Sequence, residues 1–407
     1  MMQIQTQGFS QQGSSGKEEA FEASWKKALQ GDFANIDLLR STLPAVQERA
    51  AQVRNQFKDS VFVGIGGSFW TPFALQTYFG EGAAHRLHFL DQPNSLYVNQ
   101  ILKRISDPSK VHFTFVSKSG STLETVALYS ALKSLESQWG YDLNSQSTVI
   151  CSPGNGVLQT WSQDKQIPQL EIPLGVGGRF SAFSAVGTFP LLLLNRSVED
   201  FFAGAEKARS EKAHIESLCK YSLSSFENNF WITQLWTYSQ SLMPVAQWWM
   251  QLWSESLAKK NGVRVSTPMV CCGPRDHHST FQQLMEGEKD KAIFVLQDIG
   301  REREHLSLDP LLAESLGASA VDWDLENILQ ASVEGFCGAL ESRDIPVLKM
   351  ALDFSKLSAW GEFLMSWQLA IAQMGHYLGV NPFDQPGVET GKILARQYLK
   401  SMKSKES

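Results

Sequence analysis

The chain has 407 residues, of which 43% are hydrophobic and 19% are charged, so it should fold into two or three globular domains. Its 36 Lys and Arg residues are outnumbered by 42 Asp and Glu residues, which gives a formal net charge of -6. This balance argues against non-specific capture of nucleic acid or anionic lipid, and an anionic ligand must be held by locally placed cations and backbone dipoles.

No segment resembles a membrane span or an export signal. The longest apolar run, Phe189–Leu194, is far shorter than the roughly 20 residues that a spanning helix needs. The N-terminus lacks a basic and apolar leader, and five Cys residues show no CxxC spacing. We therefore expect a cytoplasmic protein with reduced cysteines and no metal site.

The first half of the chain predicts a mobile tail followed by a helix-covered sheet. Residues 1–16, rich in Gln, Ser and Gly, are expected to be a disordered tail, and apolar residues at helical spacing predict leading helices from residue 17 onward. Short β-rich runs then alternate with helical stretches, at 61–63, 87–90, 111–116 and 148–151. Apolar strands interleaved with helices indicate a parallel sheet covered on both faces.

The second half repeats this alternation after a helical stretch at about 198–240. Candidate strands there lie at 263–265, 292–296 and 345–347. Two α/β units in tandem are the simplest account. The predicted domains are the tail, a first unit at 17–205, a second unit at 206–375 and a C-terminal helical segment at 376–407.

Two segments between a predicted strand and a predicted helix suit an anion. In Val63–Phe69 a glycine cluster lets backbone N–H groups approach a ligand at a helix start. A dinucleotide fingerprint would need glycine where this chain has Phe69, although Asp91 after the next strand keeps that alternative open. In Ser117–Thr125 several hydroxyls converge beside Gly120, which favours phosphate over an ordinary helix cap.

Three later segments supply charged groups. Arg179 follows the glycines of GVGG, where a fixed guanidinium can stabilise a negative oxygen, although a surface arginine is the plainer interpretation. Gln251 and Glu255 are four residues apart and share a helical face. A carboxylate on a helix rich in tryptophan is a candidate general base, whereas most helix glutamates are simply solvated.

The remaining candidates are histidines and one lysine. In Asp276–Ser279 the adjacent histidines cannot face the same way, so at most one is catalytic, and their spacing does not suit a metal. Lys392 lies in the early turns of a predicted helix, an unfavourable place for a structural cation, so it faces either an anion or solvent.

Taken in order, the segments GIGGS, SKSGST, GGRFS, QLWSES, DHHS and FDQPGVETGK resemble the motifs of the glucose-6-phosphate isomerase family, over about residues 55–400. The resemblance implies two sugar-isomerase (SIS) domains, each a parallel sheet sandwiched by helices, with a C-terminal helical extension. It also implies reversible conversion of glucose 6-phosphate to fructose 6-phosphate, a step of glycolysis and gluconeogenesis, with no cofactor. A homodimer that shares its active sites between subunits is implied as well.

The resemblance also implies roles for individual residues. Glu255 matches the catalytic base, Arg179 matches the arginine that stabilises the intermediate, and His278 and Lys392 match the pair linked to ring opening, the histidine coming from the other subunit. Ser117, Ser119 and Thr122 would hold the phosphate. The full set matched to substrate contacts is Gly67, Ser68, Ser117, Lys118, Ser119, Thr122, Gly178, Gln251 and Gln385.

The same residue types fit aldose-ketose chemistry, which needs one base and a cation beside an enediolate. Two alternatives stay open: a related isomerase that accepts mannose 6-phosphate, and a non-catalytic SIS module that only binds sugar phosphate. A module that only binds sugar phosphate would have no need of Glu255, Arg179, His278 and Lys392 together. The chain departs from the family pattern at Phe69-Trp70, at Leu257–Lys259 and at Pro386.

Overall fold

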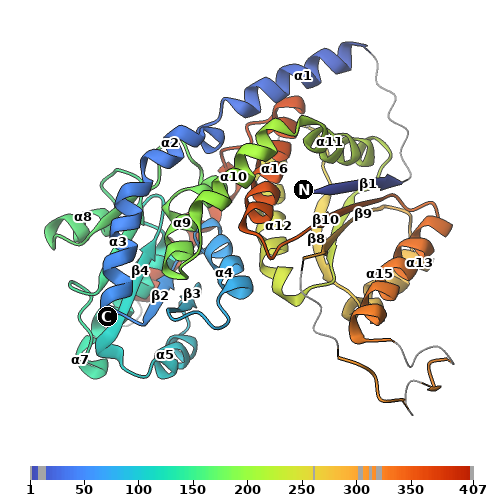
Figure 1. Ribbon diagram of the computed structural model, residues 1–407. Coiled ribbons are helices and arrows are strands. Elements are labelled where there is room, and N and C mark those ends of the chain that lie inside the picture. Colours follow the sequence, from blue (N-terminus) through green and yellow to red (C-terminus); the bar gives the residue numbers. More distant parts are fainter. Residues whose placement is uncertain are drawn as a thin grey trace.

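The computed structural model describes residues 2–7, 15–259, 262–300, 306–310, 314–317 and 323–403. In this part of the chain two β-sheets of five strands each lie on opposite sides of the molecule, with a layer of helices between them (Figure 1). The arrangement confirms the predicted α/β class with two parallel-sheet units flanked by helices.

The first sheet is parallel throughout and has the strand order β3-β2-β4-β5-β6. Its strands are β2 (Asp59–Val63), β3 (Arg86–Leu90), β4 (Val111–Val116), β5 (Ser147–Cys151) and β6 (Gln169–Glu171). Along β2, Val61 and Val63 pack on one face of the sheet while Phe62 packs on the other. Because both faces are buried, these strands read as apolar runs in the sequence.

Helices cover both faces of this sheet. The outer face carries α5 (Ser95–Arg104), α6 (Leu123–Ser134) and α8 (Val157–Asp164), with the short α7 (Glu136–Trp139) nearby. The face toward the centre of the molecule carries α3 (Leu43–Gln56), α4 (Gly67–Phe79) and α9 (Ala185–Leu193), preceded by α2 (Ile36–Ser41).

The second sheet has the order β1-β10-β9-β7-β8 and is parallel except for β1. Its strands are β1 (Gln3–Gln7), β7 (Ile232–Thr237), β8 (Thr267–Cys272), β9 (Lys291–Asp298) and β10 (Val347–Leu352). Its outer face carries α13 (Thr280–Glu286) and α15 (Leu325–Ser342). Its inner face carries α11 (Lys212–Glu227), α12 (Met243–Leu257) and α16 (Leu357–Tyr377).

One continuous hydrophobic core joins the two units. At its centre α10 (Val198–Ser210) packs along α16 at backbone distance. A Cβ on Gly204 would lie 1.9 Å from the carbonyl oxygen of Ser358, and a Cβ on Gly361 would lie 1.9 Å from that of Phe201. The predicted boundary at residue 205 thus falls inside α10, which packs against α16 of the second unit. The N-terminal helix α1 (Ser15–Leu29) also packs on α16.

Two strand predictions in the second unit were wrong. Strand β7 lies inside the stretch expected to be helical, and β8 begins at Thr267 rather than at 263–265. The centre of β7 holds buried polar side chains that hide its strand pattern. Thr233 bonds Ser266 at 2.6 Å, and the Gln234 side chain accepts a hydrogen bond from Trp236 at 2.9 Å.

The expectation of a disordered tail was also wrong for residues 2–7, whereas residues 8–14 lie outside the described part of the chain. Strand β1 adds to the edge of the second sheet, with Gln3 opposite Ala351. The Met2 side chain is 1% exposed, and its backbone N–H donates to buried Glu362 at 3.0 Å. The sequence signal was weak because an edge strand needs only one apolar face.

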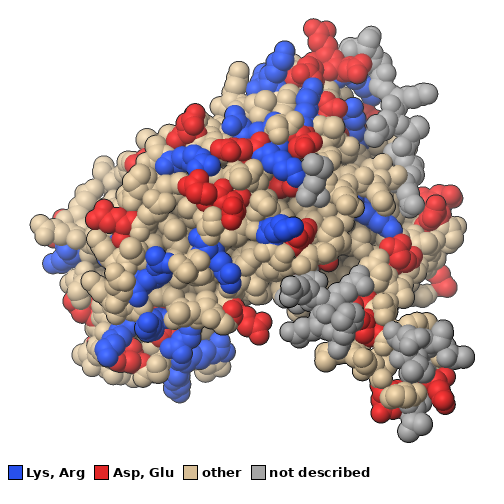
Figure 2. Space-filling model, viewed as in Figure 1, with Lys and Arg blue, Asp and Glu red and all other residues tan. Residues whose placement is uncertain are grey.

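The surface carries both signs of charge, interspersed over the upper helices of the face in Figure 2. Ion pairs between Lys17 and Glu227 at 2.8 Å, and between Arg40 and Glu206 at 3.2 Å, join the N-terminal helices to α10 and α11. Exposed pairs of this kind each add little to stability. Among the described helices, none is long and apolar enough to cross a membrane.

A buried polar network crosses the first sheet near the amino ends of its strands. Ser60 Oγ lies 2.8 Å from His85 Nε2 and 3.3 Å from His112 Nδ1. His112 Nε2 bonds Thr148 at 2.8 Å, and Arg49 donates to the same hydroxyl at 2.8 Å. Burial lowers the pKa of His85 to about 4 from its ordinary 6.5, and it lowers the pKa of His112 well below 6.5.

This network predicts acid sensitivity. Between pH 6.5 and 4 the unfolded chain binds protons at His85 that the folded chain does not, so the free energy of unfolding falls as the pH falls through this window. We expect His85 alone to contribute on the order of 3 kcal/mol to this fall. Urea unfolding at several pH values should give a flatter pH profile for His85→Gln. The control His278→Gln changes an exposed histidine and should keep the steep pH profile of the parent. Equal slopes for the two variants would contradict the assignment.

Candidate active site

Three glycine-containing loops and one helix meet between the two units. The loop after β2 leads into α4, and its Gly66 has φ +61°, a left-handed conformation that favours glycine. A Cβ on Gly66 would lie 2.8 Å from Nε2 of Gln251 on α12, and a Cβ on Gly67 would lie 2.3 Å from the carbonyl oxygen of Gly178. The glycines therefore allow backbone contact between segments more than 100 residues apart.

Glu255 lies on the part of α12 that faces these loops. Its Oε2 is 3.2 Å from Nη1 of Arg179, and its Oε1 accepts a hydrogen bond from Gln251 at 3.1 Å. The Glu255 side chain is 28% exposed, whereas that of Arg179 is only 3% exposed. The structure thus holds both carboxylate oxygens in place but leaves the carboxylate open to a ligand.

The tryptophans of α12 do not form the surroundings of this carboxylate, contrary to the environment suggested by the sequence. Trp249 and Trp253 are fully buried and pack against Phe294 of the second sheet. They anchor the helix through its opposite face. The charged group that contacts Glu255 is instead the guanidinium of Arg179.

Arg179 is a buried cation whose N–H groups are all engaged. Its Nε donates to Ser256 at 2.8 Å, and Nη1, besides contacting the carboxylate, donates to Gln385 Oε1 at 3.1 Å. Its Nη2 donates to the carbonyl oxygens of Pro382 at 2.5 Å and Asp384 at 2.8 Å. Burial lowers the pKa of this guanidinium, and the adjacent carboxylate opposes that shift. A guanidinium nevertheless stays charged near neutral pH.

Lys259 belongs to the same cluster, although the sequence did not reveal it. Its Nζ donates to the carbonyl oxygens of Glu255 at 2.8 Å and Asp384 at 2.5 Å, and it pairs with the Asp384 carboxylate at 2.9 Å. The side chain is only 10% exposed. Arg179 and Lys259 therefore both bond the turn that carries Gln385 and hold it against the end of α12. The sequence signal for this contact was the four-residue spacing from Glu255 to Lys259, which places both residues on one face of a helix.

The SKSGST loop lies at the carboxyl end of β4, before α6. Ser117 Oγ and Thr122 Oγ1 are 2.8 Å apart, and the Ser119 hydroxyl is exposed and accepts a hydrogen bond from Ser121 N at 3.3 Å. Thr122 is the N-cap of α6 but makes no side-chain capping bond, which leaves N–H groups of the first turn free of that partner. Such a loop suits an anion.

Two further substrate candidates lie beside these groups. Burial lowers the pKa of Lys118, and the charge of Arg179 lowers it further, so the two cations are electrostatic neighbours. Ser68 is partly buried in the first turn of α4, directly after the packed Gly67. The structure thus brings together the loops after β2 and β4, the Arg179 segment, Gln251, Glu255 and Gln385.

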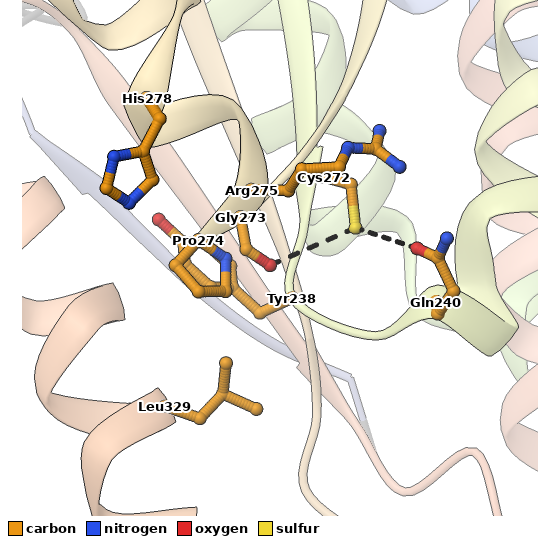
Figure 3. Close-up of a pocket in the computed structure, with 8 residues that line it drawn as sticks. All are labelled: Tyr238, Gln240, Cys272, Gly273, Pro274, Arg275, His278 and Leu329. Atoms are coloured by element: carbon orange, nitrogen blue, oxygen red, sulfur yellow. Dashed lines mark hydrogen bonds between the residues drawn. The ribbon is translucent and has the colours of Figure 1, made fainter.

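His278 lies elsewhere, in the second unit. It ends the short helix η5 (Arg275–His278) and is exposed at the rim of a cavity of about 560 Å³. Figure 3 shows His278 above Pro274, with Cys272 turned toward Gln240 on the far side. None of the groups around Arg179 lines this cavity.

The neighbouring histidine has a structural role. His277 bonds the Tyr238 hydroxyl at 2.8 Å and stacks on Phe336, with ring centroids 5.1 Å apart. Burial lowers the pKa of His277 from its ordinary value. His277 is thus partly buried, whereas His278 is exposed.

Lys392 also lies apart from the Arg179 cluster. It is on α17 (Glu389–Lys403), where its Nζ pairs with Glu389 at 2.7 Å. Residues 389–402 of this helix are exposed along their whole length. The large apolar side chains that it presents to solvent are those of Ile393, Leu394, Tyr398, Leu399 and Met402.

The chain is similar to known proteins in sequence and in fold. The family model for phosphoglucose isomerase matches residues 43–289. A glucose-6-phosphate isomerase of Thermus thermophilus is 34% identical over 357 residues, which cover 84% of each chain. A solved structure from the same species, described as a hypothetical protein, has a TM-score of 0.83 and 28% identity and covers 95% of this chain and 96% of its own. A glucose-6-phosphate isomerase structure from Chlamydia trachomatis has a TM-score of 0.76 and 21% identity, covers 93% of this chain and 78% of its own, and shares the fold.

The contact between the glycine loops predicts a sharp difference between two neighbouring substitutions. Gly67→Ala forces its new Cβ against the Gly178 carbonyl, whereas a Cβ on Gly178 meets nothing within 4 Å. We expect Gly67→Ala to lower the free energy of unfolding in urea by about 1–3 kcal/mol, as overpacking does. Gly178→Ala is the matched control and should stay within about 0.5 kcal/mol of the parent. Equal effects would show that the loops do not touch as described.

Proposed function

The chain belongs to the phosphoglucose isomerase family, and we propose that Glu255 is the base with which it interconverts glucose 6-phosphate and fructose 6-phosphate. The family model covers more than half of the chain, and the relative from Thermus thermophilus that bears the enzyme's name is 34% identical. The resemblance found in the sequence is confirmed, and membership of an enzyme family disfavours the non-catalytic SIS module.

The reaction moves one proton between two carbons. In the opened aldose, a base removes the proton on C2 and the electrons shift to the C1 carbonyl oxygen, which gives an enediolate. The proton of the O2 hydroxyl passes to O1, and the base returns its proton to C1 as the C2 carbonyl forms. One carboxylate can take up and return this proton. The step needs a base and a fixed positive charge at the enediolate oxygens, and it needs no cofactor.

The observation that carries the proposal is the pair of Glu255 and Arg179, 3.2 Å apart. A partly exposed carboxylate is held beside a guanidinium that is almost completely buried and therefore fixed in place. The Nη1 group of Arg179 is shared by Glu255 and Gln385. An enediolate oxygen that replaces the Gln385 amide at Nη1 would lie directly beside the base.

The phosphate is assigned to the loop after β4. Ser117, Ser119 and Thr122 offer hydroxyl groups, and the start of α6 offers backbone N–H groups. Lys118 adds a local positive charge in a chain whose formal net charge is -6. Gly67, Ser68 and Gly178 line the passage from this loop toward Arg179 in the proposal, with Gln251 holding the base.

We further propose that the enzyme is a homodimer, in the cytoplasm, and that the dimer completes the site. One chain leaves His278 and Lys392 away from the Glu255 carboxylate. Exposed α17 carries apolar side chains, including Leu394 and Leu399, whose burial requires another surface. Pairing with a second copy would cover this helix and supply the partner subunit's His278 as the acid that opens the sugar ring.

Replacement of the base tests the mechanism. Glu255→Gln keeps the size of the side chain but removes the proton acceptor, so kcat should fall by several orders of magnitude while KM stays within about tenfold. The measurement is a coupled assay with glucose, fructose and mannose 6-phosphates, which also reveals substrate breadth. Glu341→Gln, on the exposed side of α15, is the control and should behave as the parent. Near-normal turnover by Glu255→Gln would refute the assignment.

Mixing two inactive variants tests the shared site. In a mixed dimer of Glu255→Gln and His278→Ala, one site receives both intact residues if the histidine crosses between subunits. Random reassortment of the two chains should therefore restore roughly a quarter of the parental activity. If both residues act within one chain, no mixture regains activity. Light scattering on the parent chain gives the oligomer size independently.

A further inference from the structure

A second pocket lies beside the candidate active site but shares none of its assigned residues. It has a volume of about 440 Å³ and lies where the first turns of α4 and α5 flank the carboxyl end of β3 (Figure 1). Strands β2 and β4 carry the active-site loops at the same edge of the sheet, and β3 is next to β2. The carboxyl edge of a parallel sheet is where such folds bind ligands.

Aromatic rings form one wall of this pocket. Phe69, Trp70 and Phe73 come from α4, and Tyr97 comes from α5. Phe69 stacks on Phe73 at 4.8 Å and meets the Trp70 indole edge-on at 4.9 Å, which fixes the rings relative to one another. Trp70 remains partly exposed. A rigid aromatic wall of this kind suits a flat ligand face made of C–H groups.

Polar side chains also line this pocket. Asp91 follows β3, is half-buried, and receives no hydrogen bond or ion pair from any other described side chain. Burial raises its pKa, so a donor that reached the carboxylate would relieve an unfavourable environment. Asn94 uses its Oδ1 to cap α5 through Tyr97 N at 3.1 Å, which leaves its amide N–H groups for a ligand.

The charge of the pocket limits what it can bind. None of the described residues that line it is Lys, Arg or His, and Asp91 supplies one negative charge. A phosphate would meet no cation there, in contrast to the loop that contains Lys118. The Tyr97 hydroxyl is already engaged, since it donates to the Phe89 carbonyl at 3.0 Å. The available groups are thus the Asp91 carboxylate, the side-chain amides of Gln92, Asn94 and Gln100, and an aromatic face.

We propose that this pocket is a second binding site, for a neutral ring that carries a vicinal diol. One ring face would stack on Trp70, the two hydroxyl groups would donate to the Asp91 carboxylate, and one of their oxygens would accept from the Asn94 amide. An unphosphorylated hexose and the ribose of a nucleoside share this chemistry. The site is independent of the base at Glu255, and it gives a role to the Phe69-Trp70 step that departs from the family pattern.

The test uses the full-length enzyme with its catalytic site filled by a saturating equilibrium mixture of glucose 6-phosphate and fructose 6-phosphate. Methyl α-D-glucopyranoside and adenosine are offered separately as probes, and binding is measured by saturation-transfer NMR and calorimetry. We expect one probe to bind, and its identity distinguishes the hexose from the nucleoside. Asp91→Asn and Trp70→Ala should each weaken that binding at least about tenfold, as expected for loss of a charge-assisted bond or a stacking surface.

Asp164→Asn, an exposed acid-to-amide change on α8, is the matched control and should leave binding unchanged. Asp91→Asn should also keep its isomerase kcat within about twofold of the parent, because Asp91 takes no part in the proposed reaction. A kcat in this range shows that the variant is folded. Binding of neither probe would overturn the proposal, as would binding that survives both Asp91→Asn and Trp70→Ala. A change of oligomer size with Trp70→Ala, without probe binding to the parent, would identify the aromatic wall as a subunit contact instead.

Discussion

The site depends on the burial of one guanidinium. Removing a positive charge from water is expensive unless its hydrogen bonds and its charge are satisfied, and Arg179 meets that demand with Ser256, Glu255 and the turn at 382–385. These partners belong to different parts of the chain, so satisfying one side chain fixes the end of α12, the GGRFS loop and the C-terminal turn together. Glu255, the proposed base, is thereby placed beside the cation that the proposed reaction needs.

Close backbone contact is the second constraint. The Gly67 and Gly178 loops approach so closely that a methyl group on Gly67 would have no room, and α10 and α16 are joined in the same way through Gly204 and Gly361. The first contact lies in the site and the second in the shared core. The contact of α10 with α16 joins the two sheet units, and the loops of the first sheet face α12, which packs on the second sheet.

The residues proposed for catalysis are not all together in a single chain. Glu255 and Arg179 are in contact and the loop after β4 lies near them, while His278 and Lys392 are exposed and bond neither of the two. The exposed apolar side of α17 gives a physical reason why a second copy should bind. The aromatic pocket beside α4 is different, because it is already walled by rings and lacks only an occupant.

Much of the fold was readable from the sequence because strands buried on both faces must be apolar and because glycines mark turns. Four of the five strands of the first sheet were predicted in this way, all except β6, together with the two-unit α/β class. Strand β7 was missed because it carries the buried polar residues Thr233 and Gln234, whose side-chain oxygens bond Ser266 and Trp236. Strand β1 was missed because it gains its stability from an edge formed by β10. Neither kind of stabilisation leaves a local signal.

The sequence by itself determined the family, the order of the motifs and the residue types that the chemistry requires. Only the tertiary structure decided that Glu255 contacts Arg179, that Lys259 clamps the turn before Gln385, and that His277 is packed whereas His278 is free to face another molecule. The physical reason is that a motif records which groups are present, whereas the distance between two groups is set by packing among segments far apart in the chain.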